Sequence, residues 1–326
     1  MRPVFHAELV NGENGDPALF VDFQFMNRAL LFDMGDLSPL PPKKMLRLSA
    51  VFVSHTHMDH FIGFDRLLRT FLGREKKLLL FGPPGFTGQV LAKLSAYTWN
   101  LVENYSSSLL LFVNELHADG RCERARFDSR RKFLPEFLES AEIPDGILID
   151  EPLYRVRFDF LDHAIPSLAF ALEEKTHANI WKNRLEELGL APGIWLKSFK
   201  EAVLRLDPDD TAIIADGKSM TLGQLWPAVR IVPGQKIGYV TDAVFNEGNV
   251  ERIVNLADCA DLLFIEAMFL HQDQWLAAKR YHLTARQAGE IGRMARARAV
   301  IPFHFSPRYS GREEFLRLEA LEAFSP

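Results

Sequence analysis

Cysteine is scarce in this sequence, and long apolar runs are absent. The 326 residues include two cysteines, Cys122 and Cys259, which excludes a disulfide framework and favours a reducing compartment. No stretch approaches the roughly 18 apolar residues that a membrane helix needs. The first residues also lack the apolar run and small-residue cleavage site of a signal peptide. We therefore expect a cytoplasmic protein without a membrane span.

Neither sign of charge dominates the composition. Lys plus Arg total 38 and Asp plus Glu total 43, which gives a formal net charge of -5. This mildly acidic balance argues against a protein that coats nucleic acid through bulk charge, so any grip on a polyanion must be local. With 48% hydrophobic and 25% charged residues, the composition is globular and excludes collagen-like, disordered and coiled-coil classes.

Short apolar runs alternate with helical patterns along the chain. Five runs are typical of buried strands, namely 48–53, 78–81, 237–240, 262–265 and 299–303. Residues 18–23 and 29–33 predict a hairpin around 25–28. Apolar residues at helical spacing predict an amphipathic helix over 64–71, and Thr284 to Gln287 fits the capping box of a later helix. Strands mixed with helices throughout predict a layered α/β or α+β domain.

One short segment carries an unusual density of metal-binding side chains: Ser54-His-Thr-His-Met-Asp-His60. It lies between a predicted strand and a predicted helix. Because alternate residues of an extended segment point the same way, His55 and His57 can project together. Asp59 and His60 then turn into the helix and can face a second point nearby. Three imidazoles and a carboxylate within six residues are the ligand types that a zinc-like ion needs.

Three further polar residues occupy the same kind of position, at the ends of predicted strands. His163 follows the alternating run of 154–161, Asp242 follows the run ending at 241, and His304 follows the run ending at 303. Loops at strand ends can converge on one edge of a sheet and often carry function. Each residue alone would be an ordinary loop residue, but together with the segment at 54–60 they predict a two-metal site.

The spacing His-x-His-x-Asp-His is that of the metallo-β-lactamase superfamily, and further segments make the chain resemble ribonuclease Z, its tRNA 3′-processing branch. The matching segments occur in the family's order: 54–60, Phe81-Gly-Pro-Pro-Gly85, Asp162-His-Ala-Ile-Pro-Ser167, Val240-Thr-Asp242, Tyr281-His-Leu-Thr284 and Phe303-His-Phe-Ser-Pro-Arg-Tyr309. The resemblance implies an α+β fold of the metallo-β-lactamase type, a four-layer αββα sandwich assembled as a homodimer. It also implies two divalent metal ions. The His-rich ligand set favours zinc, but carboxylate ligands can also bind manganese or iron.

The resemblance also implies a division of roles among the ligands. The first metal would be held by His55, His57 and His163, the second by Asp59, His60 and His304, and Asp242 would bridge both. Asp59 would in addition orient the attacking hydroxide.

Two groups beyond the ligands have implied roles. His282 would protonate the leaving oxygen, held in orientation by Glu266, although the family's His-Glu-Ala-Thr reads Ile265-Glu-Ala-Met268 here. Ser306 and Arg308 resemble the segment that contacts phosphate. Two alternatives remain open: His282 as a plain neighbour of the helix N-cap, and Arg308 as a partner of a carboxylate near the C-terminus.

Motifs from residue 54 to 309 predict a single metallo-β-lactamase-like domain over 1–326, with insertions near 95–150 and 174–235. The first insertion is rich in cations, at Arg121, Arg124, Arg126, Arg130, Arg131 and Lys132. These fit either a solvated loop or helical face, or a docking surface for a polyanion. The second insertion takes the place of the family's tRNA-gripping arm but is poorer in Gly and Pro. Its phosphate and base contacts could come from Lys182, Arg184, Lys197, Lys200, Arg205, Trp181 and Trp195.

Three functional hypotheses follow. The first is a metal-dependent phosphodiesterase that cuts precursor tRNA at its 3′ end with a hydroxide activated between two metal ions. The second is a hydrolase of the same fold acting on a small phosphodiester, sulfate ester or lactone. The third is a non-catalytic metal-binding scaffold, against which the complete set of seven ligands argues.

Overall fold

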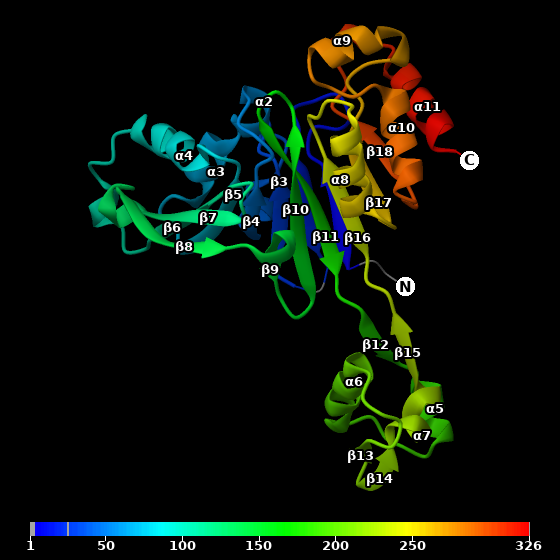
Figure 1. Ribbon diagram of the computed structural model, residues 1–326. Coiled ribbons are helices and arrows are strands. Elements are labelled where there is room, and N and C mark those ends of the chain that lie inside the picture. Colours follow the sequence, from blue (N-terminus) through cyan, green and yellow to red (C-terminus); the bar gives the residue numbers. More distant parts are fainter. Residues whose placement is uncertain (1–3, 25, 326) are drawn as a thin grey trace. The chain divides into compact units, whose positions relative to one another are not determined.

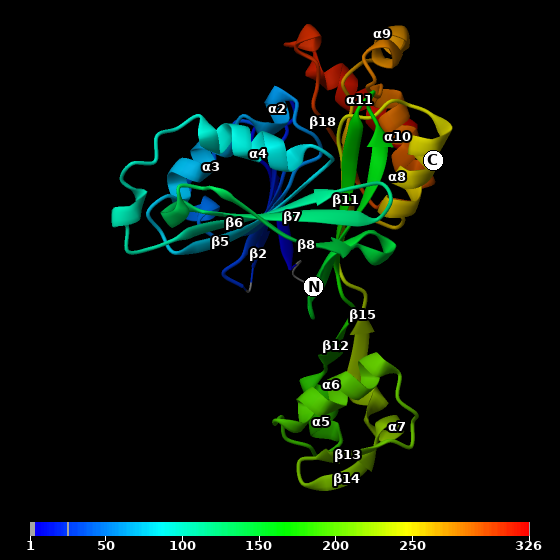
Figure 2. The same cartoon turned by 60° about the vertical axis from the view of Figure 1, so that its left-hand side comes forward.

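The computed structural model describes residues 4–24 and 26–325, and the chain forms two compact units. Unit 1 contains the described residues of 1–150, 155–172 and 236–326, and unit 2 contains 151–154 and 173–235. Figures 1 and 2 show unit 1 as two facing sheets with helices on their outer sides. Within the described residues no helix has the length and apolar character needed to span a membrane.

The first sheet of unit 1 has eight strands, which follow one another in chain order from β1 to β8. Strands β3 to β6 are parallel, whereas the flanking pairs β1–β2, β2–β3, β6–β7 and β7–β8 are antiparallel. The strands are β1 Phe5–Leu9, β2 Leu19–Phe23, β3 Ala29–Phe32, β4 Leu48–Phe52, β5 Lys76–Gly82, β6 Leu109–Leu116, β7 Arg121–Asp128 and β8 Pro135–Glu142. The predicted hairpin is confirmed as β2–β3, while Phe25 of its predicted turn lies outside the described residues.

Helices cover the outer face of the first sheet because they present apolar side chains at helical spacing. Helix α3 has the predicted bounds, Phe64–Phe71, and buries Phe64 and Phe71 in one cluster with Val51 and Leu80 of the sheet. The other helices of this region are α1 Pro42–Met45, α2 Met58–Phe61, α4 Phe86–Ser95, η1 Val102–Asn104 and η2 Ser129–Arg131.

The second sheet has six strands in the order β18-β17-β16-β11-β10-β9. They are β9 Ile147–Asp150, β10 Tyr154–Asp162, β11 Pro166–Glu174, β16 Lys236–Val240, β17 Leu262–Glu266 and β18 Val300–Phe303, with η3 Pro144–Gly146 before them. The three predicted runs between 237 and 303 are thus confirmed as β16 to β18, which are mutually parallel. Parallel strands buried on both faces explain why these runs are continuously apolar.

Helices also cover the outer face of the second sheet. Ile253, Ile291 and Leu316 share a buried cluster with Leu263 of β17. The helices are α8 Glu247–Ala257, η5 His271–Asp273, α9 Gln274–Lys279, α10 Ala285–Met294, η6 Pro307–Tyr309 and α11 Glu313–Phe324. Thr284 caps α10 with the predicted capping box, confirmed by reciprocal side-chain and backbone hydrogen bonds with Gln287.

Aromatic side chains fill the space between the two sheets. The rings of Phe32 and Phe52 stack with centroids 5.0 Å apart on the first sheet. Phe170 of the second sheet lies 5.6 Å from Phe52, and Tyr239 lies 5.7 Å from Phe32. The layers are therefore helices, sheet, sheet and helices, which is the predicted αββα sandwich.

Unit 2 has a small core of its own, which includes Leu185, Phe199 and Leu225. Its elements are β12 His177–Ile180, α5 Lys182–Glu187, α6 Trp195–Arg205, β13 Ala212–Ala215, β14 Lys218–Thr221, α7 Leu222–Leu225, η4 Trp226–Ala228 and β15 Val229–Val232. Strand β12 pairs with β15, and β13 pairs with β14. Trp195 is buried in this core and its Nε1 donates to the Ala191 carbonyl, so its ring is not free to stack on a base.

The charged segment within 95–150 is a set of strands rather than the loop or helical face that its charge run suggests. Strand β7 alternates buried Ala125 and Phe127 with outward Arg124 and Arg126. Four of the segment's six cations have carboxylate partners: Arg126 and Arg131 lie 2.6 and 2.9 Å from Glu136, Lys132 lies 3.1 Å from Glu103, and Arg121 lies 3.3 Å from Asp119. Because these carboxylates offset part of the charge, the segment is less suited to docking a polyanion than its sequence suggests.

Candidate metal centre

The segment 54–60 leads from β4 into α2, and its backbone changes from extended to helical on the way. His57 has φ -60° and ψ 155°, and the helix begins at Met58. This turn separates two imidazoles that precede the helix from Asp59 and His60 inside it. His55 and His60 are fully buried, whereas His57 is exposed.

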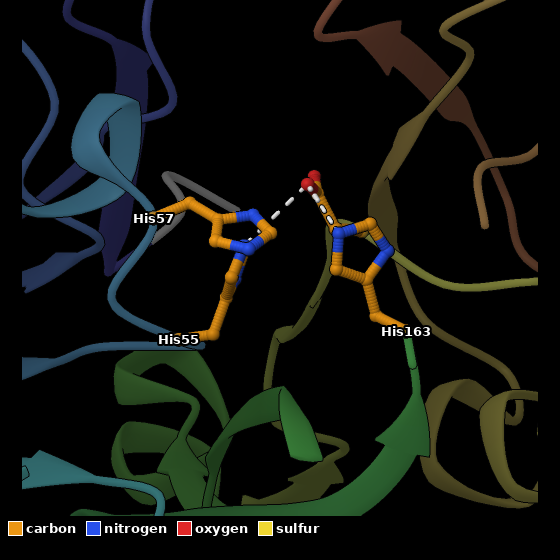
Figure 3. A group of neighbouring side chains, drawn as sticks. His55, His57 and His163 are labelled. Carbon is orange, nitrogen blue, oxygen red and sulfur yellow. Dashed lines mark ion pairs between the residues drawn. The ribbon is translucent and has the colours of Figure 1, made fainter. Parts of the chain in front are cut away.

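Three more predicted residues join this segment from the second sheet. His163 follows β10, Asp242 comes two residues after β16, and His304 directly follows β18. Figure 3 shows His55, His57 and His163 converging on one point from both sides of the site.

Asp242 stands between two sets of imidazoles. Its Oδ2 atom lies 3.5 Å from Nε2 of His55 and 3.4 Å from Nε2 of His163. Its Oδ1 atom lies 3.4 Å from Nε2 of His60 and 2.9 Å from Nδ1 of His304. Asp59 closes the second set, since its Oδ2 lies 3.2 Å from Nε2 of His304. One carboxylate thus faces both sets through different oxygens.

Hydrogen bonds to the Nδ1 atoms fix how the imidazoles point. Nδ1 of His163 donates to the Tyr281 carbonyl at 2.7 Å, and Nδ1 of His60 donates to Asp33 at 2.9 Å, because neither partner can donate. Nδ1 of His55 lies 3.1 Å from the Ser54 hydroxyl, whose proton goes to Asp33. Nε2 of each ring is therefore left facing the centre, as in histidine ligands oriented by an outer shell.

Asp33 is a residue of the site that the sequence reasoning missed. Its buried carboxylate accepts from the Ser54 backbone N–H at 2.6 Å, the Ser54 hydroxyl at 2.8 Å, His60 Nδ1 at 2.9 Å and the Tyr239 hydroxyl at 2.9 Å. Tyr239 belongs to β16, so this carboxylate also joins the two sheets. The available signal was an acidic residue directly after an apolar strand, the same signal that pointed to Asp242.

The charges of the centre shift several pKa values. Burial, reinforced by His60, lowers the pKa of His55 to about 2 and keeps its imidazole neutral. Burial also opposes a charge on His304, but the Asp242 carboxylate outweighs it and raises the pKa of His304 to about 9. Burial would raise the pKa of Asp242, yet His304 and His60 hold it well below its usual range. These shifts favour an ionised Asp242 carboxylate between the two sets of imidazoles.

The residues present fit a divalent cation. Nε2 of His55 and Nε2 of His60 are buried and have no hydrogen-bond partner among the described residues. Buried nitrogens without partners are costly unless something occupies the point they face. Two groups offer ligand atoms within 4.8 Å of one another, His55, His57, His163 and Asp242 in one case and Asp59, His60 and His304 in the other. Each group could hold a metal ion.

His282 and Glu266 form a hydrogen-bonded pair beside these groups. Nδ1 of His282 donates to Glu266 Oε2 at 3.0 Å, while Glu266 Oε1 accepts from the Ala243 N–H at 2.8 Å. Glu266 is fully buried at the end of β17. Burial disfavours a charged imidazole, but the Glu266 carboxylate raises the pKa of His282 above its ordinary value. His282 is thus more than a neighbour of the α10 N-cap.

Ser306 and Arg308 lie just beyond His304, at the start of η6. The Ser306 hydroxyl accepts from the Arg308 N–H at 3.4 Å and so caps this short helix. The Arg308 side chain is exposed, and no carboxylate lies within ion-pair distance of it in the described residues. The alternative in which Arg308 pairs with a carboxylate near the C-terminus is therefore wrong.

Comparisons of sequence connect the chain with one group of curated proteins. Ribonuclease Z of Deinococcus radiodurans is 28% identical over 300 residues, which cover 91% of this chain and 88% of that protein. Ribonuclease Z of Latilactobacillus sakei is 26% identical over 296 residues, which cover 88% and 80%. No family model matches the chain.

Comparisons of structure identify the fold. The metallo-β-lactamase fold protein YhfI from Bacillus subtilis aligns with a TM-score of 0.55 and 17% identity, over 97% of this chain and 92% of that one. The short form of human tRNase Z aligns with a TM-score of 0.54 and 18% identity, over 94% and 92%. The chain therefore has the metallo-β-lactamase fold and resembles ribonuclease Z along most of its length.

Proposed function

We propose that this protein is a metal-dependent phosphodiesterase of the ribonuclease Z type, which hydrolyses the 3′ end of precursor tRNA. The observation that carries the proposal is the convergence of two imidazole sets on the two oxygens of Asp242. The similarity to curated ribonucleases Z over most of both chains supports an RNA phosphodiester as the substrate.

Seven side chains would hold two divalent ions. The first ion would bind His55, His57 and His163, the second would bind Asp59, His60 and His304, and Asp242 would bind both. When bound, such a pair stabilises charge on the phosphoryl oxygens and makes a water molecule acidic enough to attack at neutral pH. Zinc is favoured because the donors are imidazole nitrogens and carboxylate oxygens, and manganese or iron is the alternative.

The protein's own groups position the reaction around these ions. Asp59 is partly exposed, so its carboxylate can orient an attacking water while its Oδ2 stays beside His304. Hydrolysis adds the water oxygen to phosphorus and breaks the bond to the ribose oxygen, which leaves as an alkoxide unless it is protonated. His282 supplies that proton from Nε2, because its Nδ1 is held by Glu266. The Glu266 carboxylate raises the pKa of His282, which favours the protonated ring that a general acid requires.

How the protein binds the tRNA body, away from the cleavage site, is a separate part of the proposal. Unit 2 takes the place of the tRNA-gripping arm that the sequence resemblance suggests, and we assign it this role as a substrate-docking insertion in a single functional domain. Lys182 and Trp181 are exposed there, whereas Arg184 and Arg205 are paired with Glu187 and Asp207. The grip is therefore expected to be modest and to weaken with salt.

The decisive experiment incubates the metal-loaded protein with a precursor tRNA and maps the 3′ ends produced. Cleavage after the acceptor stem supports the proposal. Cleavage of bis(p-nitrophenyl) phosphate without any cleavage of the precursor would instead favour a small-molecule phosphodiesterase, and inactivity toward both would leave a metal-binding scaffold.

Variants test the assignment of the ligands and of the acid. His57→Ala and Asp242→Ala should each lower bound metal and abolish hydrolysis. His282→Ala should retain its metals but lose about 10²–10⁴-fold in rate. His6→Ala, an exposed histidine of β1, is the matched control and should keep both metal and rate. Wild-type metal content in the first two variants would contradict the ligand assignment.

Two further expectations accompany the proposal. Elemental analysis of purified protein should find two ions for each chain, most of them zinc. Light scattering should find the homodimer that the resemblance implies. The cytoplasmic location remains a prediction of the sequence.

A further inference from the structure

Four of the eleven non-glycine residues with positive φ in the described part of the chain lie at the metal centre. Asp33, Ala164, Tyr281 and His304 have φ between 57° and 60°, in the left-handed region that side chains with a Cβ rarely adopt. Such conformations are found where the surrounding structure imposes them, often at functional sites. The positive φ angles of Asp33 and His304 are explained by the roles of these residues in the centre. Ala164 directly follows His163, which explains its backbone conformation in the same way. Tyr281 has a bulky side chain in a place where glycine would fit better.

The backbone of Tyr281 already has a task. Its carbonyl accepts from Nδ1 of His163, and its N–H donates to the Ala278 carbonyl at the end of α9. The next residue, His282, donates its N–H to Ala277. None of these bonds uses the phenol ring, so a glycine could make them equally well. Tyr281 is 40% exposed, and its backbone lies at the edge of the metal centre.

Two cations for which the structure describes no carboxylate partner directly precede Tyr281 in the sequence. Lys279 and Arg280 are exposed, and neither forms an ion pair within the part of the chain that the structure describes. Arg308, four residues after His304, is also exposed and forms no ion pair among the described residues. The contrast with β7 is clear, because Arg126 and Arg131 there share the Glu136 carboxylate. Unpaired cations beside an exposed aromatic ring are the combination that binds single-stranded nucleic acid.

We propose that Tyr281 is a substrate-positioning residue whose ring stacks on the nucleobase next to the scissile phosphate, while Lys279 and Arg280 contact the flanking phosphates. This inference rests on the proposed function and adds to it a contact with the base. The metal centre can recognise a phosphate group, which every phosphodiester has. A ring that stacks on a base places one particular phosphate over the ions without reading its sequence.

The test compares Tyr281→Gly with Tyr281→Phe on two substrates, a precursor-tRNA acceptor stem with its trailer and bis(p-nitrophenyl) phosphate. The glycine variant keeps the carbonyl bond to His163 and suits a positive φ, so its thermal unfolding midpoint should not fall. Its loss of kcat/KM on RNA should exceed its loss on the small diester by roughly 5- to 150-fold, the range for stacking on one base. The phenylalanine variant should restore the RNA activity. Tyr97→Ala, a tyrosine of 45% exposure after α4, should change neither activity.

A second substrate series identifies the base. RNA in which one of the two nucleotides flanking the cleavage site is abasic should be cut more slowly by the wild type, by the same factor as Tyr281→Gly loses. The glycine variant should then be indifferent to that abasic position, because the two changes remove the same contact. Equal sensitivity of wild type and glycine variant to both abasic positions would overturn the inference while leaving the proposed function intact. Failure of the wild type to cut any RNA would overturn the proposed function itself.

Discussion

Replacing Asp33 by asparagine should destabilise the fold and loosen the metal centre together. The carboxylate accepts four hydrogen bonds in a site without access to water, three of them at Oδ2. Asparagine has the same shape but one accepting oxygen and no charge. Its best orientation keeps the oxygen toward the Ser54 hydroxyl, His60 and Tyr239, which turns its NH₂ group against the Ser54 N–H.

The magnitude follows from counting what is lost. Three hydrogen bonds that a charged carboxylate accepts become hydrogen bonds to a neutral amide, and each loses about 1 kcal/mol of stabilisation. One buried N–H also loses its acceptor, at a cost of about 1–3 kcal/mol. The free energy of unfolding should therefore drop by about 4–6 kcal/mol, a large part of the roughly 5–15 kcal/mol typical of a domain. His60 also loses the acceptor that orients its ring, so metal affinity should fall by about 10- to 100-fold.

Urea denaturation of metal-free protein, followed by tryptophan fluorescence, measures the stability. Competition with a chromogenic chelator measures metal affinity. Asp119→Asn provides a control for the same chemical change at an exposed carboxylate, whose ion pair with Arg121 is at the surface, and should be close to the wild type in both assays. The reasoning is refuted if Asp33→Asn unfolds at the wild-type midpoint and binds metal as tightly as the wild type.

Three other predictions concern separate parts of the molecule. Burial raises the pKa of the Cys122 thiol to about 11, against about 8.5 in the unfolded chain. The contribution of the neutral thiol to stability is therefore complete below about pH 8.5 and is lost as pH rises through about 11. The urea midpoint of the wild type should fall relative to that of Cys122→Ala over this pH range. Thr284→Ala should cost about 1 kcal/mol of unfolding free energy by removing the α10 cap, measured in urea. Glu266→Gln removes the charge that raises the pKa of His282, so the alkaline limb of the kcat profile should move to lower pH; an unmoved limb would contradict the assignment of the acid.

Much of the fold could be predicted from local patterns. The run at 48–53 is apolar apart from Ser49 because β4 lies inside a parallel sheet with both faces covered, and the spacing of 64–71 defines α3 at both ends. The charged segment at 121–132 was wrongly predicted as a loop or helical face, and there is a physical reason for the error. Strand β7 carries Arg124 and Arg126 on the face opposite the helices, and a register shift between Cys122 and Arg124 breaks the alternation that would have revealed the strand.

The candidate site was predictable where its residues have a characteristic spacing and unpredictable where they depend on distant partners. His55, His57, Asp59 and His60 form a recognisable motif within six residues. Asp33 has no such motif, because its importance comes from a hydroxyl on the other sheet, 206 positions away at Tyr239. The strain at Tyr281 is likewise invisible in a sequence, since the residue before a histidine gives no indication of a positive φ.

The placement of the ligands has a consequence for how the protein is made. Three imidazoles of the centre follow a strand of the first sheet, but Asp242 and His304 follow strands of the second, about 180 to 250 residues later in the chain. Because a growing chain folds from its N-terminus as it emerges from the ribosome, the first sheet can form with its histidines still open to solvent. The complete centre cannot form until residue 304 has been synthesised. A chain that stops before residue 304 therefore lacks a ligand that added metal cannot replace.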